Sequence, residues 1–203
     1  FDSIAIKQFR KKKNLWFEKF VNLKEKNNIF FFEKKNNLKK IEKNLNFNIS
    51  KGQTFIEYSE LGLNYLKDIS KIIKKNTGGL LLIDYGYNKK RMKNTLKAIS
   101  NHKNANILKD KGNIDITHNI NFNLFKKIVK KVGGLESNLT TQRNFLLKMG
   151  IKQRAEIISK DLDFSKKANI YFRIRRLTDE NQMGNLFKVM FIKNQKNKFK
   201  LGF

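Results

Sequence analysis

The chain has 203 residues, of which 45 are Lys or Arg and 17 are Asp or Glu, giving a formal net charge of +28. It contains no cysteine, which excludes disulfides and thiolate metal sites. No apolar run approaches the ~18 residues that a membrane-spanning helix needs. One domain with a sizeable core is expected for this length.

The positive charge is carried mainly by lysine, because only 7 of the 45 basic residues are arginine. Abundant Lys, Asn, Ile and Phe without proline is typical of AT-rich coding DNA, which explains the charge without a nucleic-acid partner. Nucleic-acid readers use arginine for bidentate contacts and aromatic side chains in a groove, whereas the run IFFFE (29–33) has the pattern of a core segment. Nucleic-acid binding is therefore the least favoured function, although the field favours acidic partners or anionic surfaces.

The first quarter of the chain predicts a β-hairpin and a loop. Residues 14–23 and 29–33 are apolar runs on either side of a polar turn, which is typical of a hairpin. Residues 34–52 are rich in Lys and Asn and predict an exposed loop, and residues 54–59 predict a short strand.

A helix and a buried strand are expected next. Ser59 suits the N-cap of a helix whose apolar residues keep helical spacing as far as Ile73. Lys74 and Lys75 suit its C-terminus, and Gly78-Gly79 end it. The run LLLID, ending at Asp84, then predicts a strand buried on both faces, of the kind found inside a parallel sheet.

The second half of the chain continues the alternation of helices and strands. After a polar excursion, Asn121 is expected to cap a helix that Gly133-Gly134 end. The remaining elements are a strand near 135–140, a helix capped by Thr141, a basic helical stretch through Arg176, a strand at 186–192 and a frayed tail. This order predicts an α/β, doubly wound sheet with helices on both faces.

Ligands of such sheets bind outside the carboxyl ends of the strands. Asp84, Tyr85, Gly86 and Tyr87 occupy that position. Asp84 could accept hydrogen bonds from a ligand, and Gly86 would let the backbone approach it closely. Alternatively, Asp84 caps the next turn while the tyrosines pack at the sheet rim.

The two histidines lie in the polar excursion. Asp115, Thr117 and His118 are predicted to fold over the strand ends as a polar site, with His102 nearby, although surface histidines without a function are the simpler alternative. Their spacing matches no metal motif, so no metal is expected. No Gly-rich phosphate loop is present, which excludes a self-contained nucleotide site of the familiar kinds.

Several separated blocks carry a resemblance to a known family. They are GGLLLIDYGY, TLKAISNHK, GNIDITHNINF, TTQRNFLLKMGI and RRLTDENQMGNLFKVM. In order and spacing they resemble the MidA-like family of S-adenosylmethionine (SAM)-dependent methyltransferases, which includes the mitochondrial methyltransferase of complex I assembly. The opening FDSIAIKQF resembles the end of that family's NEFFDALPIRQF segment, and the resemblance covers essentially the whole chain.

The resemblance implies a class I (Rossmann-like) methyltransferase sheet, with Asp84 ending the fifth strand and residues 186–192 forming the seventh. It implies SAM as cofactor and a protein arginine on a complex I subunit as the methyl acceptor. Asp84, Tyr85, Asp115 and His118 are then assigned to catalysis. Asp2, Gly86 and Tyr87 are assigned to the cofactor, and His102 and Thr117 to the substrate.

The resemblance also implies that the chain is the C-terminal portion of one methyltransferase domain, without the Gly-rich SAM loop. Residues 11–52 would be an inserted hairpin and loop, and residues 54–203 the second half of the sheet. An unpaired strand edge would then favour a homodimer. A bacterial cytoplasm and a mitochondrial matrix both fit, and a non-catalytic assembly factor that binds its client protein is the alternative function.

Overall fold

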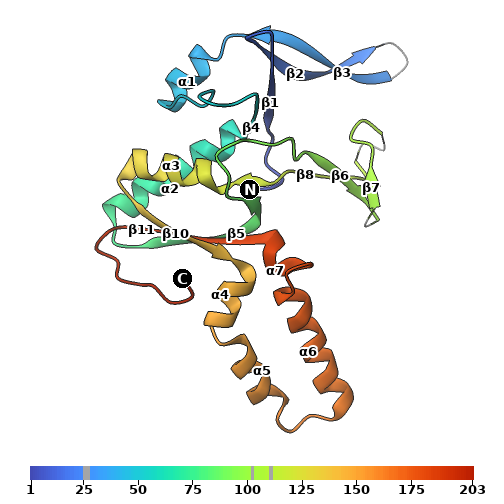
Figure 1. Ribbon diagram of the computed structural model, residues 1–203, viewed down its shortest axis with the longest axis vertical. Helices are drawn as coiled ribbons and strands as arrows, with labels where there is room; N and C mark the ends of the chain where they lie inside the picture. Colours follow the sequence, from blue (N-terminus) through green and yellow to red (C-terminus); the bar gives the residue numbers. More distant parts are fainter. Residues whose placement is uncertain (25–27, 102, 110–111) are drawn as a thin grey trace. The chain divides into compact units, whose positions relative to one another are not determined.

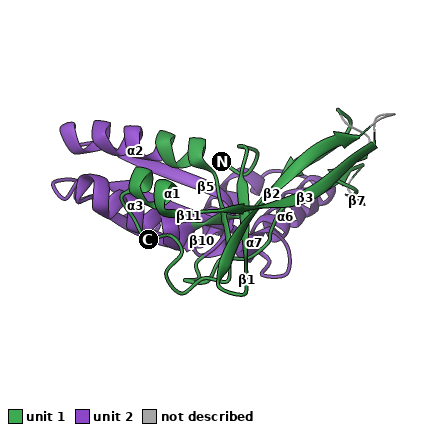
Figure 2. Cartoon of the chain, turned by 90° about the horizontal axis from the view of Figure 1, so that it is seen from above, with its two compact units in different colours: residues 1–65, 88–121 green, residues 66–87, 122–203 purple. Residues whose placement is uncertain are grey.

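The computed structural model describes residues 1–24, 28–101, 103–109 and 112–203. The chain divides into two compact units, each described by itself (Figure 2). Unit 1 comprises residues 1–65 and 88–121, and unit 2 comprises residues 66–87 and 122–203. Within the described ranges, no helix is both long enough and apolar enough to cross a membrane.

Unit 1 is built on an antiparallel sheet of four strands in the order β3-β2-β1-β4 (Figure 1). The strands are β1 (Lys7–Lys12), β2 (Leu15–Lys24), β3 (Asn28–Asn36) and β4 (Phe55–Tyr58). Lys13 and Asn14 both have positive φ, as a two-residue hairpin turn between β1 and β2 requires. The predicted hairpin is confirmed as β2 and β3, and β1 extends it by one strand.

One expectation for unit 1 is wrong, and one sheet was not anticipated. Residues 34–52 are not all loop, because α1 (Lys39–Leu45) forms there and buries Leu45 among the core residues. The polar excursion forms a second antiparallel sheet in the order β7-β6-β8, with β6 (Lys97–Ser100), β7 (Lys103–Ala105) and β8 (Asp115–Thr117). A two-residue strand, β9 (Ile120–Asn121), ends the unit.

The aromatic run at 29–33 also differs from expectation. Phe30 and Phe31 are only half-buried and Phe32 is exposed, because β3 pairs along its length with β2 alone in this sheet. Lysine side chains cover two of the rings: Lys19 Nζ lies 3.8 Å from the centroid of Phe31, and Lys24 Nζ lies 5.2 Å from that of Phe30. The run is a cation-covered hairpin surface and not a core segment.

Helix α2 (Glu60–Lys75) joins the two units, and its predicted N-cap is confirmed. Ser59 Oγ accepts the N–H of Gly62 at 2.9 Å, which satisfies a donor of the first helical turn. Lys74 and Lys75 lie in the last turn, and β5 (Gly79–Tyr87) follows.

Unit 2 has a sheet in which the central strand β11 (Phe187–Lys193) pairs antiparallel with β5 on one side and with β10 (Glu136–Thr141) on the other. β11 is therefore the strand buried on both faces, with Val189 and Ile192 inaccessible to solvent. β5 was expected in that role, but its burial alternates: Leu82 is buried while Leu81 and Ile83 are exposed. In unit 2 the described partner of β5 is β11, and this pair is antiparallel.

Helices lie on both sides of this sheet (Figure 1). They are α3 (Phe122–Gly133), α4 (Gln142–Lys148), α5 (Ile151–Ser159), α6 (Phe164–Thr178) and the single turn α7 (Met183–Leu186). α3 packs against β5 and β10, and α4 packs against β10 and β11. The predicted cap of α4 is confirmed, since Thr141 Oγ1 accepts the N–H of Asn144 at 3.2 Å.

The tail is packed rather than frayed. The rings of Phe199 and Phe203 lie 5.3 Å and 5.9 Å from that of Phe191, measured between centroids. Lys193 Nζ also donates a 3.0 Å hydrogen bond to the carbonyl of Phe199. These contacts cover one end of the β11 surface with apolar rings, which explains why Phe191 is buried.

Candidate functional site

The strand-end residues of unit 2 lie inside β5 and not beyond its end. Asp84 and Tyr85 still pair with Lys188 and Phe187 of β11, so the strand continues to Tyr87. Asp84 is buried, and its Oδ1 accepts the N–H of Tyr85 at 2.8 Å. The Tyr85 ring packs on Phe187 with centroids 4.1 Å apart. Packing therefore fixes the position of both side chains.

Lys188, which faces Asp84 across the strand pair, lies in partly buried surroundings. Burial lowers the pKa of its ammonium group below the ordinary value, because the charged form loses water. A carboxylate and an ammonium thus share one face of the β5–β11 pair. The Lys188 ammonium donates a hydrogen bond to the carbonyl of Asn185, and the Asp84 carboxylate accepts the N–H of Tyr85, so local hydrogen bonds hold both groups.

Unit 1 contains a buried carboxylate that the sequence did not single out. Glu57 of β4 accepts hydrogen bonds from Gln8 Nε2 of β1 at 2.6 Å and from the Thr95 N–H at 3.1 Å. The Thr95 hydroxyl donates to the same carboxylate, and Gln8 Nε2 also donates to Asn94 Oδ1 at 2.9 Å. All the donors are neutral, so Glu57 joins two distant chain segments without a cation.

The Glu57 network reaches Asn119, the residue that follows His118. Thr95 Oγ1 accepts the N–H of Asn119 at 2.8 Å, and the N–H of His118 donates to the carbonyl of Asp2 at 2.9 Å. The His118 side chain is more than nine-tenths buried, and its Nε2 has no hydrogen-bond partner among the residues that the structure describes. A buried polar atom without a partner is costly unless a ligand or water completes it.

The other predicted residues of unit 1 occupy different environments. Asp115 is exposed on β8, where it pairs with Ile99 of β6, and Thr117 is half-buried at the end of the same strand. Asp2 and His118 are brought together by their backbone hydrogen bond. His102 lies outside the described residues. Asp84, Tyr85, Gly86 and Tyr87 belong to unit 2, so the structure groups the predicted residues into two separate sets.

Tyr58, next to Glu57 in the sequence, is a second buried polar group. Its hydroxyl has no hydrogen-bond partner in the described part of the chain, although its ring stacks on Phe9. Burial, and then the charges of Glu60 and Glu18, raise the pKa of the Tyr58 hydroxyl well above its ordinary value. Tyr58 is therefore a neutral hydrogen-bonding group at neutral pH.

Sequence reasoning missed Gln8, Glu57, Asn94 and Thr95, and one local signal could have found Glu57. It is a carboxylate inside the short apolar strand FIEY, where a buried acid requires partners. Those partners come from residues 49 positions earlier and 38 positions later in the chain, which no local pattern reveals.

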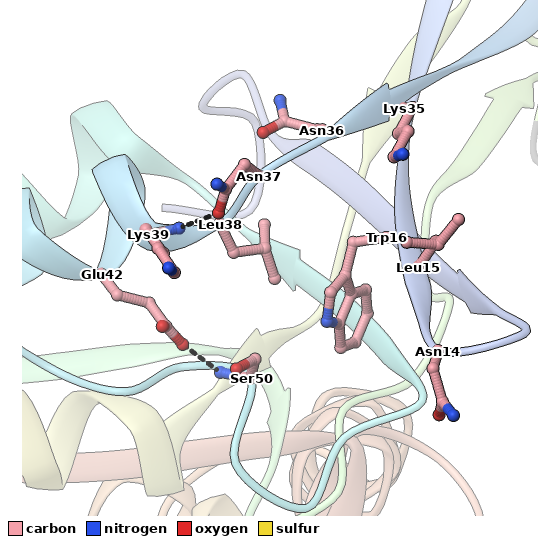
Figure 3. Close-up of a pocket in the computed structure, with 10 residues that line it drawn as sticks. All are labelled: Asn14, Leu15, Trp16, Lys35, Asn36, Asn37, Leu38, Lys39, Glu42 and Ser50. Carbon is pink, nitrogen blue, oxygen red and sulfur yellow. Dashed lines mark hydrogen bonds between the residues drawn. The ribbon is translucent and has the colours of Figure 1, made fainter.

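A pocket of about 340 Å³ lies elsewhere in unit 1, between the β1–β2 turn, the end of β3 and α1 (Figure 3). The Trp16 indole lies on one side and Glu42 on the other, with Leu38 between them (Figure 3). Glu42 Oε1 accepts the N–H of Ser50 at 2.9 Å, so this carboxylate holds the loop that follows α1. None of the predicted site residues that the structure describes lines this pocket.

The described part of the chain contains no group of three His, Cys, Asp or Glu side chains that could hold a metal ion. The polar groups on offer are carboxylates, an imidazole, a phenol and amides. Such groups orient ligands and move protons.

Two mitochondrial proteins are similar to part of the chain. The protein arginine methyltransferase NDUFAF7 of Xenopus tropicalis is 27% identical over 124 residues, which are 61% of this chain and 28% of that protein. The NDUFAF7 homolog of Caenorhabditis elegans is 28% identical over 157 residues, which are 75% of this chain and 36% of that protein. The chain thus spans about a third of the length of these relatives.

The fold is that of a solved protein. A COG1565 superfamily member from Burkholderia thailandensis, bound to S-adenosyl-homocysteine, superimposes with a TM-score of 0.79. The alignment covers 100% of this chain and 53% of that one at 20% identity. A second COG1565 structure from the same bacterium gives a TM-score of 0.78 at 20% identity, covering 99% of this chain and 55% of that one.

A family model described as "Putative S-adenosyl-L-methionine-dependent methyltransferase" matches residues 1–141. This match includes Asp2, Glu57, Asp84, Thr95 and His118, and therefore both sets of predicted residues. Since it covers more than half of the chain, the chain belongs to this family of SAM-dependent methyltransferases.

Proposed function

We propose that the chain forms part of an enzyme that methylates arginine in a protein, with SAM as the methyl donor. The observation that carries the proposal is the buried His118 imidazole, whose Nε2 has no partner in the described residues while its backbone is held in place. Family membership supports SAM as the donor, and the names of the NDUFAF7 relatives support a protein arginine as the acceptor. From the resemblance to MidA-like proteins we further propose that the arginine belongs to a complex I subunit. The reaction would then take place in a mitochondrial matrix or a bacterial cytoplasm.

His118 would take up the proton that the acceptor nitrogen loses. SAM, when bound, supplies the methyl group, and a guanidinium that gains one must release a proton to balance its charge. Guanidinium groups stay protonated in water, so a base within hydrogen-bonding reach is needed. His118 Nε2 is a nitrogen with a free position, and the Glu57–Thr95–Asn119 hydrogen bonds limit its movement.

Carboxylates would orient the acceptor. A guanidinium presents a planar set of N–H donors that a carboxylate binds well. Asp84 is buried and fixed by the Tyr85 N–H, which suits orientation of a cation, and the Tyr85 ring borders it. Asp115 is exposed, which suits contact with the substrate as it approaches the site. Thr117 and His102 would bind the substrate.

Asp2, Gly86 and Tyr87 would hold the cofactor. In the described part of unit 1, His118 Nε2 and the Tyr58 hydroxyl are buried polar atoms without a hydrogen-bond partner. Atoms of this kind are expected in a site that binds a polar ligand. Asp2 is fixed through its carbonyl by the His118 N–H, which leaves its half-buried carboxylate to accept hydrogen bonds. A carboxylate such as that of Asp2 would accept hydrogen bonds from the hydroxyl or amino groups of a nucleoside-derived cofactor.

Substitution of His118 tests this proposal. The substitution is made in a longer protein that contains this chain and has the length of its relatives. In His118→Gln, an amide that cannot act as a base replaces the imidazole. We expect methyl transfer to fall by about 10²–10⁴, the usual contribution of a general base, while calorimetry shows the same SAM affinity. Activity within threefold of wild type would remove His118 from catalysis.

The second candidate function is a non-catalytic factor that binds a client protein on the same fold. The exposed side chains of Val21 and Leu23 on β2 favour it, because apolar residues on a hairpin surface are common at protein interfaces. Client binding without any methyl transfer would establish this function instead.

A further inference from the structure

The helical arm of unit 2, formed by α5 and α6, exposes large apolar side chains. Phe164 is 86% exposed, Phe172 is 70% exposed and Ile157 is 67% exposed. α5 and α6 pack against each other, and Figure 1 shows them extending away from the unit 2 sheet. Side chains of this size are rarely left so open on a soluble surface in such numbers.

The aromatic residues of α6 share one face of the helix. At about 100° per residue, Phe164 and Phe172 lie about 80° apart on the helix, with Arg175 between them. Tyr171 lies next to them on the side where it lines a pocket with Leu147 of α4 and Glu156 of α5. Ile170, Ile174 and Leu177, on another side of the helix, are half-buried, and α6 packs against α4 and α5. Phe164 and Phe172 are therefore outside the face that holds the arm together.

The arm is also strongly basic. α6 contains Lys166, Lys167, Arg173, Arg175 and Arg176 and no acidic residue. Five of the seven arginines of the chain lie between residues 142 and 178, although lysine supplies most of its charge elsewhere. No acidic side chain in the described ranges forms an ion pair with Arg173 or Arg176. Guanidinium groups bind phosphate in a bidentate manner and lose hydration more easily than ammonium groups.

The exposed apolar side chains and the basic charge of the arm distinguish among three kinds of partner: a second copy of the chain, a nucleic acid and a lipid surface. A second copy of the chain would place two such basic helices together, which charge repulsion opposes. Single-stranded nucleic acid stacks on aromatic rings, but aliphatic side chains such as Ile157 and Ile158 add nothing to stacking. A lipid surface accepts aromatic and aliphatic side chains alike and binds cations through its phosphates.

We propose that the α5–α6 arm binds the surface of membranes that contain anionic phospholipids. Phe164, Phe172 and Ile157 enter the boundary between headgroups and acyl chains, while Arg173 and Arg176 bind the phosphates. A basic amphipathic helix with aromatic residues on its apolar side is typical of proteins that lie on a membrane without crossing it.

Vesicle sedimentation of the whole chain tests the proposal, with phosphatidylcholine vesicles and with mixed phosphatidylcholine–phosphatidylglycerol vesicles. We expect binding to the mixed vesicles only, and weaker binding as salt is added. Phe164→Ser with Phe172→Ser should weaken binding at least tenfold. Arg173→Gln with Arg176→Gln should weaken it about thirtyfold, from the usual contribution of two basic residues at an anionic surface.

Matched controls separate the arm from the overall charge. Val21→Ser with Leu23→Ser removes two side chains that are 56% and 58% exposed on β2, and Lys11→Gln with Lys34→Gln removes two exposed charges elsewhere in unit 1. Both control pairs should bind mixed vesicles within about threefold of wild type. Equal losses of vesicle binding in the arm variants and the control variants would show that the overall charge of the chain causes the binding. That result would overturn the proposal.

A second variant reports insertion directly. Phe172→Trp keeps an apolar ring, and its fluorescence should shift to the blue and be quenched by brominated lipid in mixed vesicles, above the background of Trp16. No shift and no quenching would overturn the proposal. It would equally be overturned if the arm variants lost binding to single-stranded RNA but kept their binding to vesicles.

Discussion

Gln8 of β1 donates a 2.6 Å hydrogen bond from Nε2 to the buried carboxylate of Glu57 of β4. Gln8 and Glu57 face each other in the β1–β4 register, so the bond crosses the strand pair on one face of the sheet. Thr95 occupies the other side of the same carboxylate and accepts the N–H of Asn119, next to His118. The sheet of unit 1 thereby fixes the segment that carries the proposed base.

Glu57→Gln should destabilise the protein. The amide retains one acceptor oxygen where the carboxylate has two, and it turns N–H donors toward the donors of Gln8 and Thr95. The expected loss is about 1–3 kcal/mol, measured as the free energy of unfolding in urea. Glu60→Gln is the control, because its ion pair with Lys7 is partly exposed and contributes about 0–1 kcal/mol. Equal stability of the two variants would contradict the role of Glu57.

The network also predicts different effects of two substitutions at Thr95. Thr95→Ser keeps the hydroxyl that joins Glu57 to Asn119, whereas Thr95→Val removes it and leaves both groups without that partner. Hydrogen exchange of the Asn119 amide should increase at least tenfold in Thr95→Val and less than threefold in Thr95→Ser. Similar exchange in the two variants would show that the hydroxyl does not fix this segment.

Tyr58 should make the protein sensitive to alkali. Its pKa is raised in the folded state above the ordinary value of 10.0, so the unfolded chain ionises Tyr58 first. The stability that this group contributes is therefore full below pH 10 and is lost as the pH rises beyond it. Tyr58→Phe should unfold less readily above pH 10 than wild type, whereas Tyr65→Phe, at an exposed position, should match wild type. Identical urea midpoints for all three proteins would contradict this account.

Gly184 should not tolerate alanine. A Cβ there would lie 2.6 Å from the carbonyl oxygens of Thr178 and Asp179, and these backbone atoms cannot turn aside as a side chain can. We expect Gly184→Ala to cost about 1–3 kcal/mol. Gly78→Ala places its Cβ in open space and should change stability by about 0.5 kcal/mol or less. Thermal melts of the two variants compare them directly.

Asp84→Asn should reduce methyl transfer without changing the melting temperature. The Asn oxygen can still accept the N–H of Tyr85, but the negative charge proposed to orient a cation is lost. A charge-assisted hydrogen bond contributes about 1.5–3 kcal/mol, so the rate should fall roughly ten- to a hundredfold. Asp68→Asn, at an exposed ion pair on α2, is the control. An Asp84→Asn variant with more than about a third of wild-type turnover would assign Asp84 to structure alone.

Local features of the fold were predictable from the sequence because their causes are local. Ser59 and Thr141 cap the helices that follow them with their own side chains, and Gly134 ends α3 with a positive φ. Such caps involve residues three or four positions apart, so the sequence around each cap is sufficient to predict it.

Features that depend on sheet position were not predictable. β5 and β11 have similar apolar runs, yet of these two strands β11 is covered on both faces whereas Leu81 and Ile83 of β5 are exposed. Phe30 and Phe31 form part of an apolar run, but β3 leaves their rings half-exposed to lysine side chains. Hydrophobic patterns show that a strand forms; they do not show which strands will lie beside it.

For the candidate site, the sequence likewise pointed to individual residues but not to the contacts that hold them. The position of Asp84 in an apolar strand and of His118 in a polar segment drew attention to both residues from the sequence alone. The hydrogen bonds that position His118 come from Asp2, Thr95 and Glu57, which lie far from one another along the chain. Contacts of this range follow from the packed fold and leave no pattern in the sequence.

Mass spectrometry of a protein substrate tests the central claim most directly. The enzyme used is a longer protein that contains this chain and has the length of its relatives. It is incubated with SAM and candidate complex I subunits, and the masses of the arginine-containing peptides before and after incubation are compared. The account predicts that methyl groups appear on arginine, and that His118→Gln prevents their appearance while SAM still binds. SAM binding with unmodified arginine in every substrate, or arginine methylation at the same rate in His118→Gln, would contradict it.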